Sequence, residues 1–424
     1  MKTLNQVKVI MILLLFVSFT AEIESQTNFI YGKQFGSNKD EFAFNPVADI
    51  NGNVFIAGET TGAFNGQSLG KSDGFVSKFD STGNIIWTKQ FGTPEDDKIS
   101  WLAIDKIGNA YVTGYTKGVL GEKNFGKEDI IVVKLNTDGN IEWQKQYGTD
   151  STDIGNMIYV DIQRNIYVSG KTKGAFGKSS LGDVDCLILK LDNKGNIIWN
   201  NQFGTTKYDE CKGITGDDEL NIYVCGLTSG DLSAKNKGNW DAFVAKFNSK
   251  GDQLKLFQFG TEGYDMASNI IVDKANNIYV GGSTSGDFEG KQQGEGDVLL
   301  SKLNQNFEIM WSRQFGTSKW DGINGMALNE QVSDNIVVSG CQNWPACQSF
   351  IRIYKTDGNL ISVNNYTAST KNGGTCGKGV CIDNKGNIYH TGGTGGNLFK
   401  SIDKPEGHDI FLIKLALDQN QVKH

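Results

Sequence analysis

The 424-residue sequence has little of several residue types, and each shortage argues against a class of protein. It contains four prolines against 53 glycines, and these follow no Gly-X-Y period, so a collagen-like chain is excluded. Its three arginines form no basic cluster and the formal net charge is −7, which argues against nucleic-acid binding. No apolar run is long enough to span a bilayer as a helix. The three histidines show no zinc-binding spacing, and we expect neither a metal nor a cofactor.

The first residues have the pattern of an export signal. Lys2 and Lys8 come before or at the edge of an apolar stretch from Val9 to Phe19, which has the length of a signal-peptide core. No cysteine follows this stretch before Cys186, so we do not expect a lipid anchor. We therefore expect residues 1–26 to be a cleaved signal peptide and residues 27–424 to form one secreted or cell-surface domain.

A seven-residue phrase returns along the chain at a constant interval. The phrase "WTKQFGT" is followed by "WQKQYGT", "WNNQFGT" and "WSRQFGT". Its glutamine recurs every 56 residues, at Gln34, Gln90, Gln146, Gln202, Gln258 and Gln314. Two further phrases, "GNAYVTG" and "DAFVAKF", recur with nearly the same period. Such self-similarity indicates a repeat architecture.

Each repeat predicts four short strands. In the second repeat these are Ile99–Asp105, Asn109–Thr116, Ile130–Leu135 and Ile141–Tyr147. They are rich in β-branched and aromatic residues and are bounded by turns such as "DKIGN", in which glycine supplies a positive φ. Runs such as "CLILKL" are apolar on both faces, as in a sheet packed between two neighbours. Such repeats are typical of β-propeller blades, with an open β-solenoid as the alternative.

The distribution of strands along the chain favours the closed ring. Seven second strands are present, but the last repeat stops after its third strand, Asp409–Leu415. A fitting fourth strand begins at Tyr31, in "YGKQFGS". We therefore predict an all-β fold, a seven-bladed β-propeller of four-stranded blades that is closed when the N-terminal strand completes the last blade. Trp87 and its equivalents would fill the widening wedge between blades.

Strands of the "GNIYVSG" and "DAFVAKF" types followed by "GNIIWTKQFGT" resemble the SBBP β-propeller repeats of exported and cell-surface bacterial proteins. The resemblance covers nearly all of residues 28–417. It implies the propeller fold but no activity, because the family shares a scaffold and not a catalytic motif.

Residues that break the repeat are the candidates for function. From Gly282 to Asp297 the loop after the second strand takes 15 residues, whereas from Gly340 to Gln348 it takes eight. This leaves a notch in blade six, filled by "CQNWPACQ". Non-repeated aromatic residues occur in loops expected on the same face, at Tyr208, Trp240, Tyr264, Trp320 and Trp344. We interpret them as a recognition patch, with packing between loops as the alternative.

An acidic residue follows each "FGT" phrase or its variant by the same step. These residues are Glu41, Asp97, Asp153, Asp209, Asp265 and Asp321. We interpret them as caps of local turns, and a ring of calcium ligands is the alternative. Three of them, Asp209, Asp265 and Asp321, are expected at the polar edge of the aromatic patch.

The seven cysteines lie late in the chain, where an oxidising compartment would permit disulfides. Cys341, Cys347 and Cys376 are expected near one face, so that a bridge among them would pin the notch. Cys211 and Cys225 lie on adjacent predicted strands and are a second candidate pair. Cys186 and Cys381 are interpreted as small buried hydrophobic residues.

These features predict a non-catalytic, monomeric module that recognises an extracellular protein or glycan through one loop face. The arginines do not converge, and no nucleophile elbow or phosphate loop is visible, so we expect no enzyme. The alternatives are a hydrolase or lyase that uses the loop carboxylates and a purely structural surface module.

Overall fold

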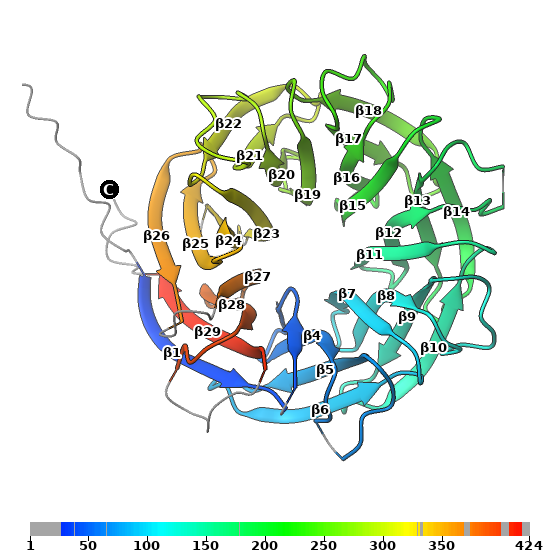
Figure 1. Cartoon of the computed structure of the whole chain (residues 1–424), viewed down its shortest axis with the longest axis vertical. Coiled ribbons are helices and arrows are strands. Elements are labelled where there is room, and N and C mark those ends of the chain that lie inside the picture. Colours follow the sequence, from blue (N-terminus) through cyan, green and yellow to red (C-terminus); the bar gives the residue numbers. More distant parts are fainter. Residues whose placement is uncertain are drawn as a thin grey trace, which may run out of the picture.

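The computed structural model describes residues 27–417, except positions 38, 65, 178, 329, 331–333, 369–373 and 400–406. In these residues seven antiparallel sheets stand around a central axis as the blades of a propeller (Figure 1). The predicted fold class is therefore confirmed. The expected signal peptide, residues 1–26, lies outside the described residues. Within the described ranges, no helix has the length and apolar character needed to cross a membrane.

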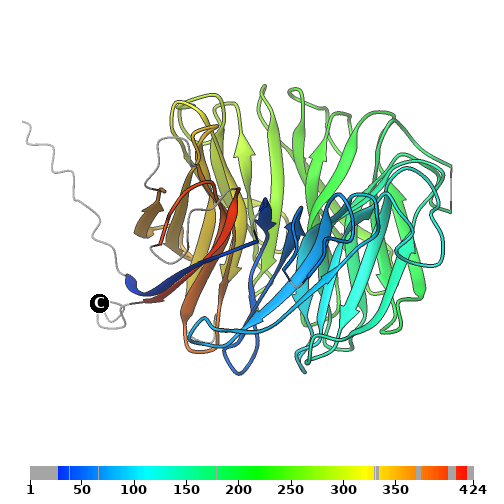
Figure 2. The same ribbon diagram turned by 60° about the horizontal axis from the view of Figure 1, so that its bottom comes forward.

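Each blade has four strand positions from the axis to the rim, and Figure 2 shows the blades from a second direction. The innermost strands are β2 (Glu41–Ala43) with β3 (Val47–Ala48), β7 (Asp97–Ile104), β11 (Asp153–Val160), β15 (Asp209–Gly216), β19 (Asp265–Val272), β23 (Trp320–Leu328) and β27 (Thr375–Ile382). The second strands are β4 (Val54–Thr60), β8 (Ala110–Thr116), β12 (Ile166–Thr172), β16 (Ile222–Thr228), β20 (Ile278–Thr284), β24 (Asn335–Trp344) and β28 (Asn387–Thr394).

The third strands are β5 (Asp73–Phe79), β9 (Asp129–Leu135), β13 (Asp185–Leu191), β17 (Asp241–Phe247), β21 (Asp297–Leu303), β25 (Gln348–Lys355) and β29 (Asp409–Leu417). The outer strands are β6 (Ile85–Phe91), β10 (Ile141–Tyr147), β14 (Ile197–Phe203), β18 (Gln253–Phe259), β22 (Ile309–Phe315), β26 (Leu360–Tyr366) and β1 (Thr27–Phe35). The strands predicted for the second repeat agree with β7 to β10 to within two residues.

The N-terminal strand closes the ring, as predicted. β1 pairs antiparallel with β29, from Thr27 opposite Leu417 to Phe35 opposite Ile410. The strand begins before Tyr31, the residue from which the sequence motif was recognised. Figure 1 shows the blue first strand beside the red last strand at the rim of blade seven. Closure gives β29 a partner on both sides and leaves no open edge there.

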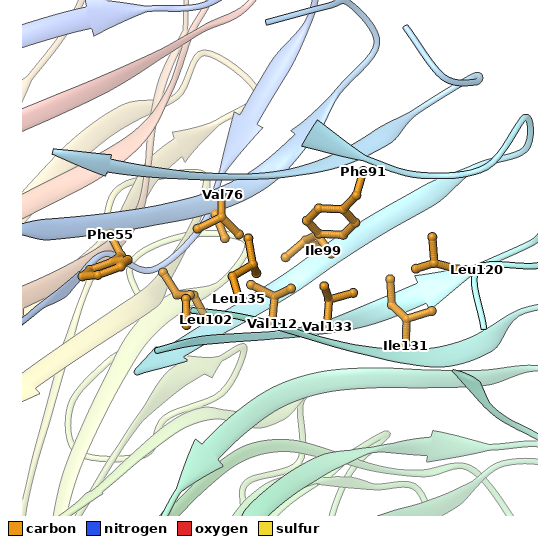
Figure 3. Close-up of a cluster of buried hydrophobic side chains, with 12 residues drawn as sticks. Phe55, Val76, Phe91, Ile99, Leu102, Val112, Leu120, Ile131, Val133 and Leu135 are labelled. Atoms are coloured by element: carbon orange, nitrogen blue, oxygen red, sulfur yellow. The ribbon is translucent and has the colours of Figure 1, made fainter. Parts of the chain in front are cut away.

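The hydrophobic core is divided into seams between neighbouring blades, and Figure 3 shows the seam between blades one and two. In β9, Ile131 and Val133 face this seam, whereas Ile130 and Val132 belong to the seam with blade three. Because side chains alternate between the two faces of a strand, a sheet packed on both sides is apolar at consecutive positions. Burial of one such side chain is worth about 1.5–3 kcal/mol, so every blade depends on both neighbours.

Successive blades are also joined through their backbones. At each junction the first residue of an innermost strand, or the second in β23, donates its N–H to a carbonyl of the preceding blade, at 2.7 to 2.9 Å. The pairs are Asp97 to Ser72, Asp153 to Glu128, Asp209 to Val184, Asp265 to Trp240, Asp321 to Gly296, Thr375 to Cys347 and Glu41 to His408. The junctions therefore share one geometry, whatever side chains they carry.

The repeated glutamine fastens the long loop of each blade to its third strand. In six blades its amide nitrogen donates to the first aspartate of that strand, at 2.6 to 3.0 Å. The pairs are Gln34 with Asp409, Gln90 with Asp73, Gln146 with Asp129, Gln202 with Asp185, Gln258 with Asp241 and Gln314 with Asp297. Blade six has Gln348 and Asn365 at these two positions.

The tryptophan of the repeated phrase bridges neighbouring blades at the rim, as the sequence predicts. The indole Nε1 of Trp87 donates to the Thr137 carbonyl of the next blade at 3.1 Å. Trp143, Trp199 and Trp311 make the same bond to the following blade. Each ring fills space at the wide end of the wedge and satisfies its only polar atom there.

The "DKIGN" turns use a left-handed residue, also as predicted. Gly108 has φ 89°, and its N–H donates to the Asp105 carbonyl at 3.0 Å. Arg164 and Leu220 occupy the same turn position in later blades and hold φ 65° without being glycine. Such a backbone costs an ordinary residue about 1–2 kcal/mol.

Candidate functional site

The notch in blade six changes the end of the blade. β24 continues to Trp344, and Trp344 pairs with Trp320 of β23. The short loop is closed by a disulfide between Cys341 and Cys347, whose Cα atoms lie 5.8 Å apart. The short loop predicted from the sequence is therefore pinned to its own strand by a covalent bond.

A cavity of about 520 Å³ lies beside this loop. Its lining comes from blades five, six and seven: Glu295, Trp320, Gly322, Asn324, Cys341, Trp344, Cys376 and Lys378. Trp344 is 57% exposed and Trp320 is half-buried. A Cβ atom at Gly296 would lie 2.4 Å from the Trp320 ring, so glycine at this position lets the indole lie flat against the backbone. We call this cavity the blade-six pocket.

The polar groups of the blade-six pocket carry both charges. Glu295 lines the pocket and forms a salt bridge of 2.8 Å with Lys319, which does not belong to the lining. Lys378 makes no salt bridge within 4 Å to any residue that the structure describes. The side-chain amide of Asn324 donates to the Gly377 carbonyl at 2.8 Å, which fixes its orientation. The pocket therefore combines two indole walls with an ammonium group that forms no salt bridge within 4 Å in the described part of the chain.

The five predicted aromatic residues fall into two groups. Trp320 and Trp344 line the blade-six pocket. Tyr208 is stacked on Trp240 with ring centroids 6.0 Å apart, and Trp240 meets Tyr264 edge-on at 5.3 Å. The second group, Tyr208, Trp240 and Tyr264, is a cluster of loop side chains packed on one another. Such packing between loops is the alternative interpretation of these aromatic residues.

Tyr208 has a further structural tie. Its hydroxyl donates to Glu210 at 2.7 Å, and Lys212 and Lys171 approach the same carboxylate at 2.8 and 3.4 Å. Burial alone would raise the pKa of Glu210, but the two lysines outweigh it and lower the pKa to about 2. Tyr208 therefore belongs to a buried polar network, and Tyr264, which is 42% exposed, is the most accessible ring of its cluster.

The expectation that Asp209, Asp265 and Asp321 form a polar edge of the patch needs correction. All three side chains are fully buried. Each accepts hydrogen bonds from the backbone N–H and hydroxyl of the threonine four residues earlier, as Asp265 does from Thr261 at 2.6 and 2.9 Å. Burial raises the pKa of Asp265 and Asp321. These acids cap their own turns, which is the first interpretation of the acidic series.

The proposed pairing of Cys211 with Cys225 is also wrong. Both are free thiols and fully buried. In the sheet, Cys211 lies opposite Gly226 and Cys225 lies opposite Gly213, so the two side chains leave opposite faces. Cys211 packs towards blade three and Cys225 towards blade five. Cys186 is buried as expected, beside Cys211.

Several functional candidates were not recognised from the sequence. Asn324 and Lys378 lie on innermost strands, three residues after Asp321 and Thr375, at a position that holds Ser100, Asn156, Lys212 and Ser268 in blades two to five. A groove of about 1060 Å³ beside blades four and five was also missed. Many of its lining residues, such as Thr261, Gly286 and Trp311, have equivalents in other blades, so the groove follows from the repeat.

Comparisons with known proteins agree with this architecture. Residues 86–121, 142–177, 198–233 and 258–289 match the SBBP β-propeller repeat. The regulatory protein FlaEY of Caulobacter vibrioides is 22% identical over 66% of this chain, and an uncharacterised WD repeat-containing protein, L264, of Acanthamoeba polyphaga mimivirus is 21% identical over 49%. The chain spans 30% and 19% of the length of these two relatives.

Two solved structures share the fold at low identity. A PL25 polysaccharide lyase, an ulvan lyase bound to GlcA(1-4)Rha3S, is 13% identical and superposes with a TM-score of 0.52 over 91% of this chain and 96% of the lyase. BBS1N in complex with ARL6DN is 10% identical, with a TM-score of 0.51 over 93% and 98%. The chain is thus a seven-bladed β-propeller that carries repeats of the SBBP family.

Proposed function

We propose that this protein is an exported recognition module that binds a glycan in the blade-six pocket. The observation that carries the proposal is the pair of indoles, Trp320 and Trp344, on the wall of a 520 Å³ cavity. Ligand pockets are concave, largely apolar and supplied with a few placed polar groups, and their volumes lie at about 300–1,000 Å³. Sugar rings offer flat C–H faces to aromatic walls and hydroxyls to polar groups.

The charge of the pocket favours a glycan that carries an acidic group. Lys378 lines the cavity and has no salt bridge in the described residues, whereas Glu295 is paired with Lys319. An ammonium group that is not held in a salt bridge attracts a carboxylate or sulfate of a ligand. The ulvan lyase of the same fold is bound to a saccharide of uronate and sulfated rhamnose, so a propeller can hold such a ligand. The proposal for this chain rests on its own pocket.

Binding without turnover is the form that the pocket supports. Its lining contains one carboxylate, that of Glu295, whereas glycoside hydrolysis ordinarily uses a pair. The loop carboxylates that a hydrolase or lyase would use, Asp265 and Asp321 among them, are buried in their own turns.

The test is a glycan array probed with the chain from residue 27, beside three variants. We expect a uronate- or sulfate-bearing glycan to bind, and Trp344→Ala or Lys378→Gln to weaken it roughly tenfold or more. Trp344 is mostly exposed, so its truncation should leave the melting temperature unchanged. Tyr264→Ala is the matched control, an exposed aromatic residue outside the pocket.

Each other result decides between the alternatives. Binding of an extracellular protein that is lost in the same pocket variants would replace the glycan by a protein ligand. Equal loss in Tyr264→Ala would place the ligand on the wider loop face. Glycan binding that none of the variants weakens would remove the pocket from the function.

A further inference from the structure

Three cysteine sulfurs lie close together at the blade-six pocket, and two of the three cysteines, Cys341 and Cys376, line it. The Sγ atoms of Cys341, Cys347 and Cys376 all lie within 4.8 Å of one another, and the first two form the disulfide. Cys341 and Cys376 both line the pocket, so dissolved thiols can reach them. A free thiol is thus held beside a disulfide at a place that small molecules can enter.

The third thiol is held there by the backbone. Cys376 is the second residue of β27, and the residue before it, Thr375, donates its N–H to the Cys347 carbonyl at 2.9 Å. This is the same bond that joins blades at every other junction. A Cβ atom at Gly374 would lie 3.2 Å from the Cβ of Cys347, which shows how closely the two segments run.

We propose that the disulfide of blade six is exchangeable and that Cys376 is its resolving thiol. The Cys376 thiolate attacks one sulfur of the Cys341–Cys347 bond and forms a new S–S bond with it. The old S–S bond breaks, and the other cysteine leaves as a thiolate that takes up the proton released by Cys376. One disulfide and one thiol are present before and after, so no oxidant or reductant is consumed.

The exchanged form would link blade six covalently to blade seven. Blade six is the one that lacks the Asp–Gln pair, with Gln348 and Asn365 in its place, and blade seven begins with Thr375 where other blades have an acid. A disulfide to Cys376 would supply a cross-link there. Exchange would also open the loop that contains Trp344. Any effect on ligand binding rests on the proposed function, whereas the exchange itself does not.

The test is disulfide mapping of the folded chain in glutathione buffers of several ratios. Thiols are trapped with N-ethylmaleimide after long incubation, because burial raises the pKa of Cys376 and keeps its thiolate scarce. Proteolysis and mass spectrometry then identify the linked peptides. We expect two species in the wild type, Cys341–Cys347 and a bridge from one of these residues to Cys376. In Cys376→Ser only the first should remain.

The variant Cys341→Ser isolates the second bridge. We expect it to form Cys347–Cys376 in oxidised glutathione. Cys186, Cys211 and Cys225 are fully buried, so they should stay unlabelled in every folded sample and report unfolding if they react. If the variant unfolds by this criterion, the wild-type map decides alone.

The proposal is overturned if Cys376 is alkylated completely in the wild type at every glutathione ratio. It is also overturned if folded Cys341→Ser leaves both remaining thiols of the triad alkylated in oxidised glutathione. The mapping uses no ligand, so its failure would leave the glycan proposal untouched, and failure of the glycan array would leave the exchange untouched.

Discussion

Gln146 donates its side-chain amide to the carboxylate of Asp129 at 2.7 Å, across neighbouring strands of blade two. The same amide reaches the Gly118 carbonyl at 3.0 Å, and its oxygen accepts the N–H of Leu120 at 3.0 Å. One buried side chain thus ties the outer strand, the third strand and the long loop together. This is why the glutamine returns in six blades.

Replacing this glutamine should cost much more stability than replacing the other glutamine of the strand. Gln146→Ala leaves buried donors and acceptors without partners, and we expect a loss of about 3–5 kcal/mol in the free energy of unfolding. Gln144 is exposed and makes one bond, to the Leu120 carbonyl, so Gln144→Ala should cost less than about 1 kcal/mol. Urea denaturation of both variants measures the difference. Equal losses would contradict the role assigned to Gln146.

Two substitutions at the left-handed turn position, one to glycine and one from glycine, should change the free energy of unfolding in opposite directions. Arg164 is exposed and holds φ 65°, so Arg164→Gly should raise the free energy of unfolding by about 0.5–1 kcal/mol. Gly108→Ala at φ 89° should lower it by about 1 kcal/mol, although the new Cβ would meet no atom closer than 3.6 Å. Chemical denaturation of the pair tests the sign. A loss in both variants would show that the Arg164 side chain contributes more than its backbone conformation costs.

Ring closure can be tested by removing the closing strand. Deletion of residues 27–37 removes β1, and with it the hydrogen bond from Gln34 to Asp409. It also exposes the edge of β29. We expect the melting temperature to fall by roughly 10 °C or more relative to the chain that begins at residue 27. Calorimetry of the two chains provides the measurement. Identical melting would mean that the pairing of β1 with β29 does not support the ring.

His390 gives one blade a pH dependence of its own. It stands where other blades have residues such as Val112, is fully buried and contacts Ser349 at 2.6 Å and the Gly379 carbonyl at 2.9 Å. Burial lowers its pKa to about 4. The folded state therefore binds this proton less tightly than the unfolded state does. The contribution of neutral His390 is complete above pH 6.5 and is lost as the pH falls through 4.

Comparison of the wild type with His390→Val isolates the contribution of His390 to the pH dependence of stability. Between pH 7 and pH 4 the wild type should lose up to about 3 kcal/mol relative to the variant. Buried carboxyls with raised pKa values, such as Asp97 and Asp153, act in the opposite direction but are common to both chains. Urea unfolding at several pH values gives the two curves. A difference that stays constant with pH would show that His390 does not titrate in this range.

The sequence was sufficient for the ring but not for the details of the site. The 56-residue period, the turn glycines and the rim tryptophans are local patterns, and the structure repeats them in space. The direction of a side chain within a turn is not local in this sense. The sequence suggested for Asp265 both a turn cap and a place at the polar edge of the patch, and only the folded loop, in which Asp265 is buried and bonded to Thr261, decides for the cap.

Contacts between side chains of different blades were the hardest feature to predict. The blade-six pocket joins Trp344 to Lys378, which lies in the next blade. Cys211 and Cys225 show the same difficulty within one blade, because two cysteines on adjacent strands cannot pair when they are offset by one position and face apart. Register fixes which face a residue occupies, and register is set by the whole sheet.

The meeting of β1 with β29 has a further consequence for engineering. Thr27 lies opposite Leu417, so the two ends of the described chain emerge side by side at the rim. A short linker could join them, and the chain could be cut in the connection between any other two blades. Such a circular permutant would turn the pairing that now closes the ring into an ordinary hairpin, and its new ends would lie at the junction between two complete blades.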